Sequence, residues 1–187
     1  MSRLALALVH WPVLDRDGGV VTTAITNLDL HDLSRSARTY GVSDVFVVHP
    51  VAAQRKLAER IRDHWVGGSG KERIPDRAAA LDLLRVVPSL EEARAALRAS
   101  DEGRAHEVWT TAAAARGGAV TSWAEGRARL EGAASVLVLF GTGWGLTPDI
   151  CAAADVRLEP IHGAPGSGYN HLSVRAACAI TLDRLRG

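Results

Sequence analysis

The stretch "SVLVLFGTGWGLTPD", residues 135–149, is the most informative part of the sequence for the fold. It begins with Ser135–Phe140, an apolar run of the length expected for a buried strand. Three glycines follow at every second position, Gly141, Gly143 and Gly145. Glycines at such a place indicate that the backbone turns tightly or approaches a ligand closely. The stretch therefore predicts a buried strand that leads into a ligand-binding turn.

Strand-like and helical patterns alternate along the rest of the chain. Apolar runs predict strands over residues 4–9, 44–49, 85–87, 107–111, 135–140 and 156–161. Periodicity and capping signals predict helices over residues 29–40, 52–65, 77–84, 90–99, 123–130 and 169–185, another from Pro148, and a loop over 67–75. Strands separated by helices require crossover connections. We therefore expect one α/β domain over residues 1–187, with a mostly parallel sheet covered by helices on both faces.

The composition limits the class of protein. The chain has 187 residues, of which 47% are hydrophobic, so it is long enough to bury a sizeable core and disorder is not expected. Its formal net charge of +1 indicates no strong overall field for nucleic acid, although a local basic patch is compatible with that value. The apolar run Leu4–Val9 is too short for a signal peptide, and no run approaches the ~20 residues of a membrane span.

The two cysteines, Cys151 and Cys178, form neither a CxxC pair nor a metal-ligand spacing with histidine. Two thiols in a chain with a full core are typical of buried, reduced residues in a cytoplasmic protein. We therefore expect a cytoplasmic protein that needs no metal and has no membrane segment.

The glycine turn has other interpretations. The pattern "GTGWG" fits dinucleotide-binding and class I methyltransferase folds, but there the turn normally follows the first strand. Gly141 lies in the last quarter of the chain, which leaves too few residues for the remaining strands. A Walker phosphate loop fails because Glu72 follows Lys71 where Ser or Thr is needed. The structural alternative is a tight turn that binds nothing, with Trp144 in the core.

A second glycine-rich segment follows the last predicted strand. It contains Gly163, Gly166 and Gly168, after which "YNHLS" opens the predicted final helix. Free backbone amides at a helix start suit a polar ligand. Open parallel sheets bind ligands beyond the carboxyl ends of their strands, so both glycine-rich segments are candidates for a binding site.

These two segments also carry a resemblance to a known family. "FGTGWGL" followed by "PIHGAPGSGYNHLSVRAACAI" resembles the C-terminal half of the trefoil-knot (SPOUT) RNA methyltransferases. The similarity is to a bacterial subgroup of S-adenosylmethionine-dependent enzymes that also occurs fused to tRNA guanine methyltransferases. "TTAITNLDLHDLSRSARTYGVSDVFVVHP" resembles its N-terminal block, and "EVWTTAAAA" its strand before the cofactor loops. The resemblance implies a deep C-terminal trefoil knot, a homodimer, and S-adenosylmethionine bound by three loops.

The resemblance also implies which residues bind the cofactor. Leu146, Ile161 and Leu172 are apolar candidates to enclose the adenine ring, and backbone groups of the glycine-rich loops are candidates for its polar atoms. The full set of implied cofactor residues is Thr110, Thr111, Ala112, Gly141, Thr142, Gly143, Trp144, Gly145, Leu146, Ile161, His162, Gly168, Tyr169, Asn170, His171 and Leu172.

Three residues are candidates for catalysis. In SPOUT enzymes an arginine of the first block commonly faces the partner's cofactor site, which implies that role for Arg35. His31, four positions earlier on the same predicted helix face, is a candidate proton acceptor because histidine ordinarily titrates near neutral pH. His31 as a solvated helix residue is the alternative. Asn170 has three open roles: binding cofactor, capping the final helix, or orienting the substrate.

The other polar residues of the first helix have ordinary structural roles in this interpretation. Asn27 is a candidate cap for the helix, and Asp29 and Asp32 are expected to be ordinary first-turn carboxylates.

RNA contacts are expected where basic residues flank the glycine-rich residues 67–70. The candidates there are Arg55, Lys56, Lys71 and Arg73, and the alternative is a solvated face. Taken together, the sequence predicts a cytoplasmic, dimeric methyltransferase that moves a methyl group from S-adenosylmethionine to RNA, with tRNA as the expected substrate. A cofactor-binding, dimerising or RNA-docking module without catalysis of its own is the alternative.

Overall fold

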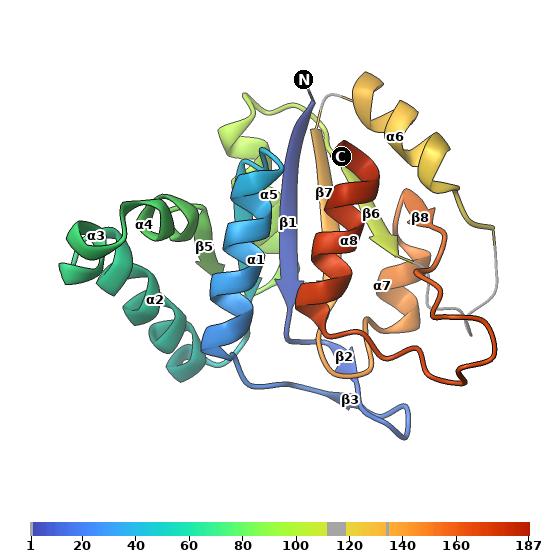
Figure 1. Ribbon diagram of the computed structural model, residues 1–187, viewed down its shortest axis with the longest axis horizontal. Coiled ribbons are helices and arrows are strands. Elements are labelled where there is room, and N and C mark those ends of the chain that lie inside the picture. The colour runs from blue at the N-terminus through green and yellow to red at the C-terminus, as the bar shows by residue number, and fades with distance from the viewer. Residues whose placement is uncertain (1, 112–118, 134) are drawn as a thin grey trace.

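The computed structural model describes residues 2–111, 119–133 and 135–187. Six strands form one sheet in the order β5-β4-β1-β7-β6-β8, and all of these pairings are parallel. Figure 1 shows β1 at the centre of this sheet. The expected parallel α/β architecture is therefore confirmed. The strands are β1 (Arg3–Val9), β4 (Asp44–Val48), β5 (Leu84–Val87), β6 (Glu107–Thr111), β7 (Ser135–Gly141) and β8 (Val156–Leu158).

Helices cover both faces of the sheet, as expected. Successive strand residues point to opposite faces. The leucines at positions 4, 6 and 8 of β1 accordingly belong to one buried cluster, and residues 5, 7 and 9 belong to another. The first cluster includes residues of α1 (Asn27–Thr39), α2 (Ala52–Val66), α4 (Pro75–Leu81), α6 (Trp123–Gly132) and α8 (Val174–Arg186). The second includes residues of α5 (Leu90–Ser100) and α7 (Pro148–Ala152).

The prediction of a loop over residues 67–75 is wrong. This segment contains α3 (Ser69–Arg73), and α4 begins at its end. Gly70 is buried, and a Cβ atom there would lie 2.7 Å from the ring of Trp65. The missing side chain lets α3 fold back against α2. Glycine has a low intrinsic helix propensity, which tertiary packing overrides here.

The predicted ends of the last strand and the last helix are also wrong. β8 stops at Leu158, and the chain then leaves the sheet. The amide of Glu159 donates to the carbonyl of Thr121 (2.9 Å). The last helix, α8, begins at Val174 and is capped by the hydroxyl of Ser173, which accepts from the amide of Ala176 (3.2 Å). Residues 159–173 therefore form one continuous loop, so Asn170 and His171 do not begin a helix.

Two local features near the amino terminus differ from the expectations. Thr26, not Asn27, caps α1, because its hydroxyl accepts from the amide of Asp29 (3.2 Å). A short hairpin of β2 (Val13–Leu14) and β3 (Val20–Val21) precedes α1, and two-residue strands are too short to leave a periodic signal in the sequence. The predicted end of α1 is confirmed, since Gly41 adopts φ +65° after the C-cap.

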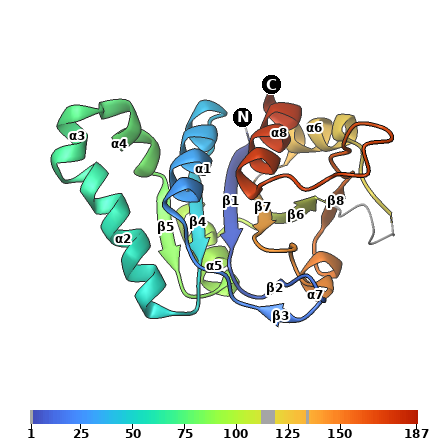
Figure 2. The same cartoon turned by 60° about the horizontal axis from the view of Figure 1, so that its bottom comes forward.

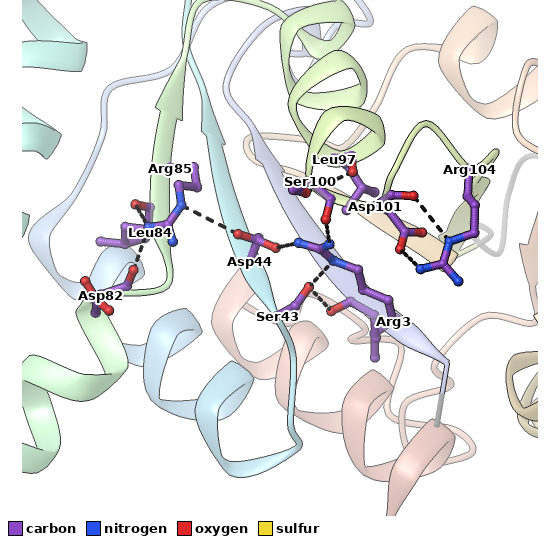
Figure 3. Close-up of polar contacts among 11 residues, drawn as sticks. Arg3, Ser43, Asp44, Asp82, Leu84, Arg85, Leu97, Ser100, Asp101 and Arg104 are labelled. Carbon is purple, nitrogen blue, oxygen red and sulfur yellow. Dashed lines mark hydrogen bonds and ion pairs between the residues drawn. The ribbon is translucent and has the colours of Figure 1, made fainter. Parts of the chain in front are cut away.

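The amino ends of three strands are joined by a polar network (Figure 3). Arg3 at the start of β1 pairs with Asp44 at the start of β4 (2.8 Å) and donates to the Ser43 hydroxyl (3.1 Å). Arg85 on β5 approaches the other oxygen of Asp44 (3.5 Å). The buried carboxylate of Asp44 is thus compensated by two arginines, as buried charges require. This network stabilises the edge of the sheet opposite the strands' carboxyl ends.

The cysteine prediction agrees with the structure, because Cys151 and Cys178 are both buried and neither forms a disulfide. Burial raises the pKa of the Cys178 thiol to about 12. Among the described residues, no helix has the length and apolar character needed to cross a membrane.

Candidate functional site

A cavity of about 580 Å³ opens at the carboxyl end of β7. From β1 the chain continues to β4 and β5 on one side of that strand. The later strands β7, β6 and β8 lie on the other side of β1, so the strand order reverses between β1 and β7. Ligands bind at such a switch point in open parallel sheets. The volume lies within the range of small-molecule pockets. The pocket is lined by Thr23, Ala24, Thr26, Asp29, Thr111, residues 139–146, Cys151, residues 170–174 and Ala177.

The glycine turn forms one wall of this pocket. A Cβ atom at Gly141 would lie 2.5 Å from the amide nitrogen of Leu146, so the turn closes tightly on itself. Gly143 has φ +60°, and its Cβ would lie 2.8 Å from the carbonyl oxygen of Leu14 in β2. These glycines therefore let the turn pack closely on itself and on β2. Close approach of the turn to a ligand stays a prediction. Trp144 is 51% exposed, so its predicted alternative place in the core is wrong.

A chain of hydrogen bonds holds the turn against the end of β1. The Thr142 hydroxyl donates to the carbonyl of Val9 (3.1 Å), so the Thr23 hydroxyl must donate to the Thr142 oxygen (2.5 Å). Thr23 then accepts from Nδ1 of His10 (3.0 Å), which assigns the proton of a neutral imidazole to Nδ1. Burial, reinforced by the neighbouring His49, lowers the pKa of His10 to about 4.

This shift predicts a pH-dependent stability. An unfolded histidine with a pKa of 6.5 gains a proton as the pH falls from 7 to 4.5, whereas folded His10 stays neutral. The unfolded state is thereby favoured at low pH, and the free energy of unfolding should fall by about 2 kcal/mol between pH 7 and pH 4.5 through His10 alone. Urea unfolding at both pH values measures this loss.

The matched variant is His10→Asn, whose amide retains a donor near Nδ1 but does not titrate. His31, His49 and His106 also have lowered pKa values and remain in both proteins, so the difference between them reports His10. We expect the variant to lose less stability than the wild type between pH 7 and 4.5. Equal losses would contradict the assigned burial of a neutral His10.

A buried carboxylate joins the N-terminal and C-terminal parts of the pocket. Asp29 on α1 is 8% exposed and lines the pocket. Its Oδ1 accepts from Arg175 of α8 (3.1 Å), and its Oδ2 accepts from the Thr26 hydroxyl (2.6 Å). Arg175 also pairs with Asp32 (3.3 Å). Asp29 is therefore more than the ordinary first-turn carboxylate that we expected, because nothing in the local sequence indicates a partner in the last helix.

Similarity to known proteins identifies the family to which a chain with this pocket belongs. Residues 3–187 match the family described as SAM-dependent RNA methyltransferase. The chain belongs to this family. The predicted resemblance to SPOUT enzymes is confirmed, and S-adenosylmethionine is the family's cofactor.

Individual relatives agree with this membership. A tRNA (guanine-N(1)-)-methyltransferase of Nitratidesulfovibrio vulgaris is 40% identical over 184 residues, which cover 98% of this chain but only 42% of that protein. The chain thus spans less than half the length of this relative. An uncharacterized protein of Aquifex aeolicus is 36% identical over 180 residues, 96% of this chain and 86% of its own.

The fold is shared with solved structures of methyltransferases. The SpoU methyltransferase AviRb from Streptomyces viridochromogenes superposes with a TM-score of 0.60 at 17% identity, covering 98% of this chain and 58% of the other. At this identity the likeness concerns the fold alone. The C-terminal knot itself stays a prediction.

Most of the cofactor residues expected for this methyltransferase family lie around one cavity. Thr111, all residues of the turn 141–146, and residues 170–172 line the pocket. Thr110 is buried in β6, and its hydroxyl has no partner within the described part of the chain. The lining does not include Ile161, His162, Gly168 or Tyr169, and Ala112 lies outside the described residues. Ile161 still supports the pocket wall, because its carbonyl accepts a hydrogen bond from the side-chain amide of Asn170 (3.0 Å), which lines the pocket.

An aromatic cluster stands at the rim of the pocket. The rings of Trp144 and His171 meet edge-on at 5.3 Å, and His171 meets Tyr169 in the same way at 5.3 Å. Tyr169 is 67% exposed. The cluster joins the two glycine-rich segments that the sequence analysis singled out.

The candidate catalytic residues separate into two groups. Asn170 lines the pocket, whereas Arg35 and His31 line a different groove on the other side of α1. The two thus share a helix face, as predicted. Burial and the nearby Arg77 lower the pKa of His31, so it is neutral at pH 7 but a weaker base than an unperturbed histidine.

The candidate RNA-binding residues are not gathered into one loop. Arg55 donates to the carbonyls of His49 (2.9 Å) and Pro50 (2.6 Å) and so supports the end of β4. Lys56 is exposed on α2, and Lys71 and Arg73 are exposed on α3. Within the described ranges, no group of three or more metal-ligating side chains occurs.

Proposed function

We propose that this chain transfers a methyl group from S-adenosylmethionine to RNA, with tRNA as the substrate class. The observation that carries the proposal is the pocket itself. Two separate segments, the glycine turn 141–146 and residues 170–172 just after the second glycine-rich segment, line one cavity at the carboxyl end of a parallel sheet. The tRNA assignment rests on the named activity of the relative from N. vulgaris.

The residues present fit this cofactor. The tight closure at Gly141 brings the peptide groups of the turn onto the pocket wall, where they are available to adenosine and to the amino-acid end. Leu146 and Leu172 supply apolar surface for the adenine ring. The bound cofactor would supply a methyl group on a sulfonium. The charges of Asp29 and Arg175 balance each other beside it, so the pair orients α1 and α8 without adding net charge.

A homodimer is part of this proposal. Arg35 does not line the pocket of its own chain, and it lies beside a shallow hollow between α1 and α8 that small residues such as Ser36, Ala176 and Ala179 line. A second copy seated on this hollow would bring Arg35 toward the partner's pocket. We place the protein in the cytoplasm, in keeping with two buried, reduced thiols.

Mass spectrometry of RNA nucleosides tests the function. A strain without the gene is expected to lack one methylated nucleoside in its tRNA, and the wild-type gene is expected to restore it. Purified protein incubated with this tRNA and S-adenosylmethionine should regenerate the same nucleoside. Binding of cofactor and RNA without methyl transfer, together with an unchanged nucleoside profile, would instead identify a docking module without catalysis.

A further inference from the structure

The side of α1 that faces away from the cofactor pocket borders a second concavity. Figures 1 and 2 show α2, α3 and α4 set out from the sheet beyond α1. A groove of about 870 Å³ runs between α1 and this arm. We call it the α1–α2 groove; it is lined by Asn27, Leu28, His31, Asp32, Arg35, Leu57, Arg60, Ile61, His64, Trp65 and Arg77.

The groove carries an excess of positive charge. Arg35 and Arg60 are exposed, and within the described chain their guanidinium groups have neither a hydrogen bond nor an ion pair. Arg77 lies over the ring of Trp65, with 4.9 Å between its guanidinium carbon and the ring centroid. Asp32 is the acidic residue of the lining, and it already pairs with Arg175 (3.3 Å). Three arginines thus face the groove without a free carboxylate to compensate them.

Apolar and aromatic surface lies between these charges. Leu28 is 61% exposed and Leu57 is 39% exposed, one on each side of the groove. The rings of Trp65 and His31 meet edge-on at 5.4 Å between the two helices. A surface that combines arginines with apolar and aromatic side chains suits a polyanion with flat, weakly polar bases, which is the chemistry of unpaired RNA.

The α1–α2 groove is continuous with the site described above. Asp32 and Arg35 line both this groove and the hollow between α1 and α8. Ser173 lines both that hollow and the cofactor pocket. The three concavities therefore follow one another around α1, and a strand bound in the groove would approach Arg35 from the outside.

We propose that the α1–α2 groove binds the substrate RNA, with Arg60 and Arg77 contacting its phosphates. This inference rests on the proposed function and extends it, because it assigns RNA contacts to residues other than the basic residues around residues 67–70. The overall net charge of +1 does not reveal such a site, because it sums charges over the whole protein and not over one groove.

The test measures the affinity of the full chain for a fluorescein-labelled, unmodified tRNA transcript at several salt concentrations. The double variant R60A/R77A is expected to bind about tenfold more weakly at ~0.1 M salt. It should also lower the slope of log affinity against log salt by about 2, because two phosphate contacts are lost. The double variant R60K/R77K keeps the charge and should retain most of the slope.

The matched control is R94A/R98A, which removes two exposed arginines from α5 on the opposite face of the sheet. It should bind tRNA as the wild type does. S-adenosylhomocysteine binding should be unchanged in R60A/R77A, and its melting temperature should fall only by the small amount expected for losing the contact of Arg77 with Trp65, which separates loss of RNA contacts from loss of fold.

Several outcomes would overturn the groove assignment: equal losses in R60A/R77A and R94A/R98A, no loss in either, or no tRNA binding by the wild type. A change in dimer dissociation in R60A/R77A, with tRNA affinity intact, would assign the groove to a second copy of the chain instead. If tRNA binds through the groove but no methyl group is transferred, the groove assignment stands and the proposed catalysis fails.

Discussion

Replacing Gly143 with valine is expected to weaken S-adenosylhomocysteine binding by about 100-fold or more in calorimetry, which corresponds to losing two or three backbone contacts. Gly143 has φ +60°, a conformation that a β-branched residue avoids. Its new Cβ would also lie 2.8 Å from the carbonyl oxygen of Leu14, which already accepts from the amide of Trp144 (2.9 Å). The turn must therefore move away from β2, and the pocket wall moves with it.

Gly103→Val is the control for backbone strain alone. Gly103 has φ +79°, lies between α5 and β6, and has open space where its Cβ would stand. Both variants should lose stability in urea unfolding, but only the Gly143 variant should lose the ligand. Full affinity in a folded Gly143→Val protein would show that the turn does not bind the cofactor.

Mixing Arg35→Ala with Gly143→Val is expected to restore about a quarter of the wild-type methyl transfer, although each variant alone should retain only about 1% or less. The reason is geometric. If Arg35 serves the partner's pocket, a mixed dimer contains one site with both defects and one with neither. Random exchange gives about half mixed dimers, each with one of two sites intact.

Differently tagged chains verify that the mixed dimers form, and activity is measured on the tRNA that the nucleoside analysis identifies as substrate. Arg38→Ala is the matched control, because Arg38 is an exposed arginine in the last turn of the same helix, and it should remain active. Tagged heterodimers that are no more active than either parent would show that Arg35 serves its own chain or the fold. A lowered melting temperature in Arg35→Ala would indicate the structural role.

Much of the fold could be predicted because it depends on local patterns. The strand β6 has its predicted bounds, Glu107–Thr111, and the predicted capping box between Ser122 and Glu125 opens α6. Buried parallel strands are apolar on both faces, so their signal is continuous and strong. The predictions failed where packing between elements decides, as at Gly70, where α3 packs on Trp65 of α2, and after Leu158, where the chain bonds to Thr121.

The candidate site shows the same division. Glycine spacing and the family resemblance located the turn 141–146 and residues 170–172, and both line the pocket. The pairing of Asp29 with Arg175 could not be predicted, because the two residues are 146 positions apart. The hydrogen bonds by which His10 and Thr23 hold Thr142 could not be predicted either, since hydroxyl and imidazole side chains carry no sequence signal of a partner.

Local patterns in the sequence suffice to predict the alternation of strands and helices, the glycine turn after β7, and the side chains that share each helix face. What each face of α1 contacts depends on the tertiary structure. Asp29 faces the pocket beside α8, whereas His31 and Arg35, on the same helix, face the groove beside α2. Helical periodicity specifies which side chains lie together, but the neighbour of each face depends on how the buried face packs on β4 and between α4 and α8, which are distant in sequence from each other.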